Sequence, residues 1–361
     1  MAIKVFVVDD SAFMRRIISD ILSLDEEIEV IGTGKNGKDA LEQLKVIKPD
    51  IVTLDVEMPV MDGIETLREI MSNYEIPVVM LSSITVEGAE ATLKALELGA
   101  IDFITKPSSI FDMDSDSKKT ELIDKIKGIA KVKIPPKAPT KKPAKIPERK
   151  STRRSIFNRS KSTGFIKRDE KVANLIAIGT STGGPRALQS VIPYFNKNIN
   201  GSILVVQHMP PGFTKSLANR LDGLSQVTVK EAEHGEEIIK GWCYIAPGDH
   251  HMKVEKKGNK LYIKLTQDSV VSGHRPSVDV LMDSVADITS VNIYGVILTG
   301  MGGDGAKGMK KIRNNRGYTI AQNEETCVIY GMPKVAVNLG AIEEILSLDK
   351  IAPHLNKKVG V

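Results

Sequence analysis

Short apolar runs alternate with amphipathic stretches over the first 128 residues of the chain. The apolar runs cover residues 3–8, 28–34, 50–55, 77–82 and 102–105. Between them, stretches such as AFMRRIISDIL and DALEQLKVI repeat their apolar residues at the spacing of one helix face. Five strand–helix units of this size predict a (βα)5 domain with a parallel, doubly wound sheet.

A second α/β pattern begins near residue 171. LIAIGTS, ILVVQHM and YGVILTG each have the pattern of a strand, and each is followed by a helical pattern. Before the third of these strands, the segment from His251 to Gln267 predicts a β-hairpin that turns near Gly258 and Asn259. We therefore expect residues 171–361 to form a doubly wound, mostly parallel α/β domain that carries a hairpin.

The segment that joins the two patterns has a composition of its own. Residues 131–168 hold 14 Lys and Arg, five Pro and a single acid, Glu148. Their balance of +13 exceeds the net charge of +5 for the whole chain, so the rest of the chain carries −8. High charge and low hydrophobicity disfavour a packed core. We interpret residues 129–170 as a flexible basic linker between domains at 1–128 and 171–361.

Composition also bears on where the protein works. Its two cysteines, Cys243 and Cys327, argue against a disulfide scaffold and fit a reducing cytoplasm. The N-terminus enters a strand pattern directly, and no apolar run approaches the roughly 18–20 residues of a membrane span. We expect a cytoplasmic protein with no signal peptide and no membrane insertion.

Polar residues gather at the carboxyl ends of the strands predicted in the first domain, where ligands of parallel sheets collect. They are Asp9, Asp10, Asp55, Glu57, Ser82 and Lys106. Clustered carboxylates with room for water suit Mg²⁺. A carboxylate beside such a cation can accept a phosphoryl group. Lys106 would then pair with the phosphate, and Ser82 would bond one of its oxygens.

The motifs DD at 9–10, LDVEMPVMDG at 54–63, LSS at 81–83 and TKP at 105–107 resemble those of response-regulator receiver domains. The resemblance implies that Asp55 is the phosphoacceptor and that Lys106–Pro107 is a cis peptide. It implies a Mg²⁺ site formed by Asp9, Asp10, Asp55 and the backbone of Glu57. Ser82 stands where many receivers have threonine, which keeps the hydroxyl.

The second domain opens with Gly179-Thr-Ser-Thr-Gly183, which matches the G-x-S-x-G pattern of an exposed nucleophilic serine. Such a glycine-rich turn between strand and helix also occurs as a phosphate-binding loop or as a plain turn. The motif alone leaves all three interpretations of Ser181 open. A base and an orienting acid are needed to choose between them.

Two residues after other strands meet that need. Among the six histidines, His208 directly follows the strand ILVVQ, so it is expected at the same sheet edge as Ser181. Asp304 follows YGVILTG and is a candidate orienting acid, although helix capping is an equally common use of aspartate. The order Ser, His, Asp differs from that of α/β-hydrolases but is compatible with a triad, since triads are defined by geometry.

IGTSTGGP, QHMPPGF, APGDHHM, SGHRPSVDVL and LTGMGGDGA together resemble the catalytic domain of chemotaxis receptor methylesterases. That family joins this domain to an N-terminal receiver through a linker. The resemblance implies a Ser181–His208–Asp304 triad, with Thr182 lining the site and the Met301 N–H stabilising the oxyanion. His274 and Arg275, in the SGHRPS loop, are either receptor contacts or solvated loop residues, and the sequence leaves both interpretations open.

The resemblance also implies the function. We expect a phosphorylation-activated esterase that hydrolyses glutamate methyl esters of methyl-accepting chemotaxis receptors and deamidates receptor glutamines. A chemotaxis histidine kinase would be the phosphodonor, Mg²⁺ would serve the receiver, the esterase would need no cofactor, and the chain would be a monomer. The rivals are a response regulator with a DNA-binding output and a phosphate-binding domain. The α/β pattern after residue 171 offers no compact helical DNA reader, so we expect no nucleic-acid partner.

Overall fold

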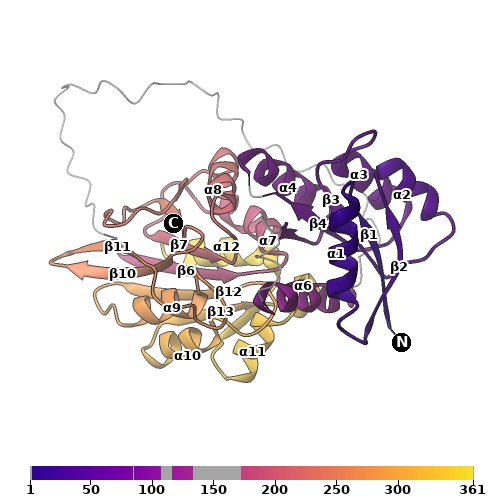
Figure 1. Ribbon diagram of the computed structural model, residues 1–361. Helices are drawn as coiled ribbons and strands as arrows, with labels where there is room; N and C mark the ends of the chain where they lie inside the picture. The colour runs from indigo at the N-terminus through magenta and orange to yellow at the C-terminus, as the bar shows by residue number, and fades with distance from the viewer. Residues whose placement is uncertain (1, 84, 107–115, 133–171, 361) are drawn as a thin grey trace, which may run out of the picture.

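The computed structural model describes residues 2–83, 85–106, 116–132 and 172–360, which form two α/β domains packed side by side (Figure 1). Each domain is built on one fully parallel sheet of five or seven strands. No helix in these described ranges is both long and apolar enough to cross a membrane.

The N-terminal domain alternates strands and helices, and its sheet has the order β2-β1-β3-β4-β5. Its strands are β1 (Ile3–Val8), β2 (Ile28–Gly34), β3 (Ile51–Asp55), β4 (Val78–Ser82) and β5 (Asp102–Thr105). Its helices are α1 (Ala12–Leu22), α2 (Gly37–Gln43), α3 (Gly63–Asn73), α4 (Val86–Leu98) and α6 (Asp116–Ile129). These strands match the five apolar runs of the sequence to within one residue, so the predicted (βα)5 sheet is confirmed.

Local chemistry explains where these elements begin. Every residue of the two central strands β3 and β4 is buried, as expected for strands with helices on both faces. Side-chain oxygens of the residues before α1, α2, α3 and α4 accept a hydrogen bond from a backbone N–H in the first turn. These N-caps are Ser11, Asn36, Asp62 and Thr85.

The C-terminal domain has a seven-stranded sheet of order β14-β13-β12-β6-β7-β9-β8. Its strands are β6 (Asn174–Thr180), β7 (Ser202–Gln207), β8 (Thr228–Glu231), β9 (Trp242–Ile245), β12 (Asn292–Ile297), β13 (Tyr318–Gln322) and β14 (Glu344–Leu346). Its helices are α7 (Gly184–Val191), α8 (Phe213–Leu224), α9 (Val278–Ala286), α10 (Ala306–Asn314), α11 (Met332–Asn338) and α12 (Leu348–Lys358), with short 3₁₀ turns at Ile192–Tyr194 and Glu324–Thr326.

The predicted hairpin is present as a separate antiparallel pair, β10 (His251–Lys257) and β11 (Lys260–Thr266). Gly258 and Asn259 form its two-residue turn, and Gly258 has a φ of 60°, which a glycine tolerates without strain. The expected doubly wound domain with a hairpin is therefore confirmed.

The last ordered helix of the first domain ends at Ile129, and the first strand of the second domain begins at Asn174. The linker interpretation for residues 129–170 falls almost wholly on residues 133–171, which lie outside the described residues. The expected cis peptide at Lys106–Pro107 also lies outside them, because Pro107 is not described.

One face of the N-terminal domain, made by α4, β5 and α6, lies against the carboxyl edge of the C-terminal sheet (Figure 1). The rings of Phe103 in β5 and Phe213 in α8 stack with their centroids 4.6 Å apart. A Cβ added to Gly128 in α6 would lie 2.9 Å from the side chain of Met301. The first domain therefore covers the edge at which the sequence places its candidate site.

Candidate active site

Ser181 lies in the turn between β6 and α7, half-buried, and its N–H donates to Thr299 O at 3.1 Å. The turn depends on Gly183, which has a φ of 77°. An added Cβ there would lie 2.6 Å from Val328 Cβ, so only glycine fits this close approach. The serine is thus presented directly before the positive N-terminal end of α7. Its hydroxyl makes no hydrogen bond within the described part of the chain.

His208 lies beside this turn because β7 is the neighbour of β6. Thr180 and Gln207, the last residues of the two strands, are register partners, and His208 N donates to Thr180 O at 3.2 Å. On the ring of His208, Nε2 is 2.8 Å from Asp304 Oδ2. The other ring nitrogen, Nδ1, is buried and has no hydrogen-bond partner among the described residues. It is the nitrogen left to accept a proton.

Asp304 follows β12, the neighbour of β6 on the other side, and its side chain is only 2% exposed. Four groups hold its carboxylate. Ser277 Oγ donates to Oδ1 at 2.8 Å, Asp279 N donates to Oδ1 at 3.0 Å, Val278 N donates to Oδ2 at 2.7 Å, and His208 Nε2 lies 2.8 Å from Oδ2. The carboxylate therefore sits at the N-terminus of α9, where the helix dipole favours negative charge.

These donors decide the ionisation of Asp304. Burial would raise its pKa, but the hydrogen bond and charge attraction of His208, with the N–H groups of Asp279 and Val278, hold the pKa below its usual range. Asp304 is thus an anion whose carboxylate holds the His208 imidazole through Nε2. The structure brings His208 and Asp304 together as the sequence led us to expect, and Ser181 directly follows β6, the strand that lies between β7 and β12.

The other two residues assigned to this site occupy different positions. Met301 lies in the loop after β12, and its N–H donates no hydrogen bond among the described residues. The Thr182 side chain is 2% exposed, and its Oγ1 donates to Asp102 Oδ2 at 2.8 Å. Asp102 belongs to β5 of the first domain, so a residue of the other domain already occupies the hydroxyl next to Ser181.

Sequence reasoning missed the role of the SGHRPS loop. The His274 ring stacks on the His208 ring with their centroids 3.7 Å apart and an interplanar angle of 17°. Burial, with the nearby charge of His208, lowers the pKa of His274 to about 4, so it is neutral near pH 7. Arg275 is not a free loop charge, because its guanidinium NH2 nitrogen lies 2.6 Å from Asp249 Oδ1. The only sequence signal for His274 was its place in the SGHRPS motif, which is one of the motifs that carry the family resemblance.

Gln207 is a second residue that the pattern did not single out. Its Nε2 donates to Ser181 O at 3.0 Å and to His208 O at 3.2 Å, and so ties together the two loops that carry the serine and the histidine. Gln207 is the last residue of a buried strand, and nothing in the sequence separates it from the other residues of that strand as a candidate for the site.

The acidic cluster of the first domain forms at the carboxyl ends of β1 and β3. Carboxylate oxygens of Asp9, Asp10 and Asp55 all lie within 4.8 Å of one another. Lys106 Nζ lies 2.8 Å from Asp9 Oδ2 and 2.7 Å from Asp55 Oδ2. These two oxygens are buried and have no hydrogen bond of good geometry among the described residues. Hard oxygen ligands clustered in this way fit a divalent cation such as Mg²⁺.

The pKa of Asp55 lies above its usual value. Burial raises it to about 6, and the repulsion of Asp9 adds to this against the opposing attraction of Lys106. Burial would lower the pKa of Lys106, but its contacts with Asp55 and Asp9 raise it above the usual value. One ammonium group therefore faces two carboxylates, and the site has an excess of negative charge.

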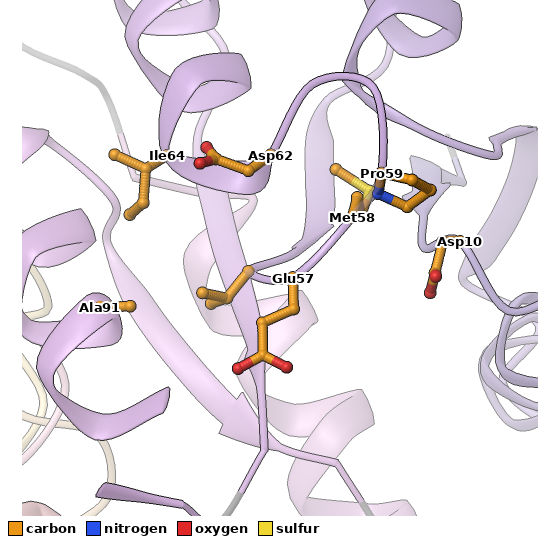
Figure 2. Close-up of a pocket in the computed structure, with 8 residues that line it drawn as sticks. Asp10, Glu57, Met58, Pro59, Asp62, Ile64 and Ala91 are labelled. Atoms are coloured by element: carbon orange, nitrogen blue, oxygen red, sulfur yellow. The ribbon is translucent and has the colours of Figure 1, made fainter. Parts of the chain in front are cut away.

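An open pocket of about 460 Å³ lies beside this cluster (Figure 2). Asp10 and Glu57 project from the loops after β1 and β3, and Ala91 contributes from α4 on another side. The Glu57 N–H donates to Asp55 Oδ1 at 3.3 Å. Asp10, Glu57 and Ala91 thus lie on the walls of a pocket next to the acidic cluster.

The Ser82 hydroxyl makes hydrogen bonds to helix α4. Ser82 is fully buried, its Oγ donates to Gly88 O at 3.2 Å, and it accepts from Thr92 Oγ1 at 2.7 Å. Both partners belong to α4. Its contact with a phosphate on Asp55 stays a prediction, and in the structure the hydroxyl anchors α4 to the end of β4.

Family comparisons agree with the two domains. The family model described as CheB methylesterase matches residues 176–355, and the model of the response regulator receiver domain matches residues 5–115. A protein of Halalkalibacterium halodurans is 46% identical over 98% of this chain and 97% of its own length. The chain belongs to the CheB methylesterase family.

Further relatives carry the same name. The Halalkalibacterium protein and one from Pyrococcus abyssi, 45% identical over 97% of this chain and 91% of its own length, are both named protein-glutamate methylesterase/protein-glutamine glutaminase. A crystal structure of the Thermotoga maritima CheB methylesterase catalytic domain matches with 46% identity and a TM-score of 0.51. It covers 52% of this chain and 99% of the Thermotoga chain, as expected if it corresponds to the C-terminal domain alone.

Proposed function

We propose that the chain is a serine esterase that hydrolyses glutamate γ-methyl esters of chemotaxis receptors and deamidates receptor glutamines. The observation that carries this proposal is the pair of His208 and Asp304, 2.8 Å apart, at the sheet edge where Ser181 is presented. The activity named for relatives that match nearly the whole chain supports the same reaction. It makes the protein an adaptation enzyme of bacterial chemotaxis that works in the cytoplasm.

The chemistry follows from the positions of the protons. Ser181 Oγ loses its proton to the free ring nitrogen of His208 as it attacks the ester carbonyl, and Asp304 stabilises the imidazolium that forms. The N–H of Met301 is free to bind the oxyanion, a contribution of about 3–4 kcal/mol for such a donor. The imidazolium then protonates the leaving methoxide, which departs as methanol. Water attacks the acyl-enzyme in a mirrored step and releases a glutamate carboxylate.

A primary amide has nearly the same shape as a methyl ester. The same steps with glutamine release ammonia instead of methanol and leave the same carboxylate. No further group is needed for the second activity, which is why we assign both reactions to one site.

The test is methanol release from a methylated receptor fragment. We expect Ser181→Ala to reduce kcat by at least about 10³-fold, because the variant keeps the fold but has no nucleophile. Ser190→Ala is a matched control, since Ser190 is an exposed hydroxyl on α7 that bonds only Arg186 O. Near-normal methanol release by Ser181→Ala would disprove the proposal.

We also propose that Asp55 is the phosphoacceptor of the receiver domain, with a chemotaxis kinase as the donor. Asp9, Asp10, Asp55 and the backbone of Glu57 would hold Mg²⁺, which when bound supplies charge neutralisation during phosphoryl transfer. Lys106 is placed to pair with the phosphate after transfer, since its Nζ lies 2.7 Å from Asp55 Oδ2.

The packing of the two domains supports inhibition by the receiver in the absence of phosphate. Asp102 holds Thr182, and Phe103 stacks on Phe213, so β5 closes the approach to Ser181. Helix α4 connects the two sites, because its Ala91 lines the pocket beside Asp55 while its C-terminal part contacts α8. Withdrawal of the Ser82 hydroxyl from α4 toward a phosphate would loosen this helix at its first turns.

A further inference from the structure

The surface formed by α7, α8 and the turn before α7, part of which the receiver covers, carries polar groups that the esterase chemistry does not use. Arg186 and Gln189 lie one turn apart on α7, and Arg220 lies on the neighbouring helix α8. Thr182 lies just before α7, beside the nucleophile. These four side chains, Thr182, Arg186, Gln189 and Arg220, form what we call the α7–α8 strip, which leads away from Ser181.

The receiver places carboxylates on this strip. Glu97, in the last turn of α4, accepts two hydrogen bonds from the Arg220 guanidinium, from Nε at 2.6 Å and from NH2 at 2.8 Å. Gln189 Nε2 donates to Glu97 Oε1 at 3.1 Å. At the other end of the strip, Thr182 Oγ1 donates to Asp102 Oδ2. A bidentate Arg–carboxylate pair is selective for planar anions, so the strip is built to bind carboxylates.

The strip also has unused capacity for an anion. Arg186 is an exposed residue whose side chain makes no hydrogen bond or ion pair with any other described residue, although partial burial of its guanidinium lowers its pKa. The Arg220 side chain is still 50% exposed in its pair with Glu97, so the contact with the receiver is reversible rather than deeply buried. Two positive side chains on adjacent helices therefore face a region that a second anionic partner can reach once α4 has moved.

The proposed reaction supplies such a partner, and this step rests on the proposed function. Each turnover converts a neutral ester or amide into a glutamate carboxylate. A receptor segment that carries several modified glutamates therefore becomes more anionic with every site that is hydrolysed. An enzyme that moves along such a segment gains from a surface that binds the neighbouring carboxylates while the next neutral side chain enters the site.

We propose that the α7–α8 strip is the docking surface for the acidic segment of the receptor that flanks the modified glutamate, with Arg220 as its principal contact. In the inhibited protein, α4 occupies this surface, and Glu97 takes the position of a receptor carboxylate. The receiver thus blocks the substrate at two places, since Asp102 covers the reacting centre and Glu97 covers the docking surface.

If Arg220 has this role, Arg220→Ala should raise activity in the unphosphorylated protein and weaken receptor binding in the phosphorylated protein. Without phosphate, Arg220→Ala breaks the pair with Glu97 and raises hydrolysis of a small ester such as p-nitrophenyl acetate. With acetyl phosphate and Mg²⁺ present, the same variant raises the KM for a methylated receptor fragment roughly threefold to tenfold, because it lacks a charge-assisted contact. Its kcat with the receptor fragment and its kcat/KM with the small ester stay at the wild-type values in this state.

Two variants separate docking from inhibition. Glu97→Gln also breaks the pair with Arg220 and raises activity without phosphate, but it leaves Arg220 free, so its receptor KM with acetyl phosphate equals that of the wild type. Arg316→Ala removes one positive charge from an exposed residue between α10 and β13, and it changes neither quantity.

The proposal is supported if Arg220→Ala alone raises the receptor KM in the full-length protein with acetyl phosphate, and if added NaCl narrows its difference from the wild type. It is overturned if Arg220→Ala and Glu97→Gln have the same receptor KM, which would make the strip a contact for the receiver only. Failure of the proposed function looks different, because the wild type would then release no methanol from the receptor fragment.

Discussion

The carboxyl edges of the two sheets carry aspartates with opposite electrostatic surroundings. Asp304 receives hydrogen bonds from Ser277 and from two N–H groups of α9, and its pKa is held below the usual range despite burial. Asp55 is buried equally deeply, but two other carboxylates lie within 4.8 Å, and its pKa rises to about 6. The same topological position thus holds one carboxylate surrounded by hydrogen-bond donors and one carboxylate crowded by other carboxylates.

The difference explains what each edge can do. A carboxylate with all its donors in place is a fixed part of the active site, and it can orient an imidazole without reorganising. A carboxylate crowded by two others, with one ammonium group between them, can be stabilised further by a divalent cation, and we propose that its state changes when a phosphoryl group is added. The catalytic edge is preorganised, and the receiver edge is responsive.

We expect the largest effect on activity when the charge of Asp304 is removed while the groups that donate to it are kept. We expect Asp304→Asn to lower kcat for methanol release by roughly 10³–10⁴-fold, because the amide cannot stabilise the imidazolium of His208. The measurement is turnover of a methylated receptor fragment with acetyl phosphate, with circular dichroism as the control for folding. A loss of less than tenfold would mean that Asp304 is a helix-capping residue rather than part of a triad.

Stability measurements sharpen the comparison on the receiver side. Because folding raises the pKa of Asp55, the folded state binds a proton more tightly than the unfolded chain, whose aspartates titrate near 3.9. Without Mg²⁺, the wild type should therefore gain about 1–2 kcal/mol relative to Asp55→Asn as the pH falls from 7.5 through 6 to 5.

Denaturant unfolding of the two proteins at both pH values measures this difference. Addition of Mg²⁺ at pH 7.5 should also stabilise the wild type and have little effect on Asp55→Asn, since a bound cation removes the same repulsion. A wild type that loses stability relative to Asp55→Asn on acidification would show that Asp55 has the usual behaviour of a paired carboxylate.

The smallest expected effect concerns the ring that covers His208. We expect His274→Ala to lower kcat/KM roughly tenfold, because the stacked ring confines the imidazole, and a stacked aromatic pair contributes about 0.5–1.5 kcal/mol. His274→Phe keeps a flat ring and should retain most of the activity and the wild-type pH profile. Equal losses in both variants would show that a nitrogen of His274, and not its ring face, is required.

The sequence was sufficient to predict most of the framework that these experiments probe. The apolar runs predicted the strands of both sheets that carry the site, and residues directly after strands had to meet at one edge because the strands are parallel. Ser181, His208 and Asp304 were selected as candidates in this way, and the contact between His208 and Asp304 is present in the structure. Short elements without a clear period, such as β14 at Glu344–Leu346, were not identified.

What the sequence could not provide are contacts between segments that no strand pairing relates. The stack of His274 on His208 and the hydrogen bond of Ser277 to Asp304 depend on how a loop folds back over the sheet edge. The hydrogen bonds of the Ser82 hydroxyl to α4 could not be predicted either, because a hydroxyl at a strand end has several partners within reach, and its contact with a phosphate stays a prediction. The pairing of Glu97 with Arg220 depends on how the two domains pack, and no strand pairing links the domains at this contact.

The most direct test of the link between the two edges is the response of methanol release to a phosphodonor. Acetyl phosphate and Mg²⁺ are added to the wild type and to Asp55→Ala, with a methylated receptor fragment as the substrate. The account predicts that turnover rises several-fold in the wild type and stays constant in the variant, because only a phosphorylated Asp55 moves α4 and β5 from the catalytic edge. An equal rise in both proteins would contradict it.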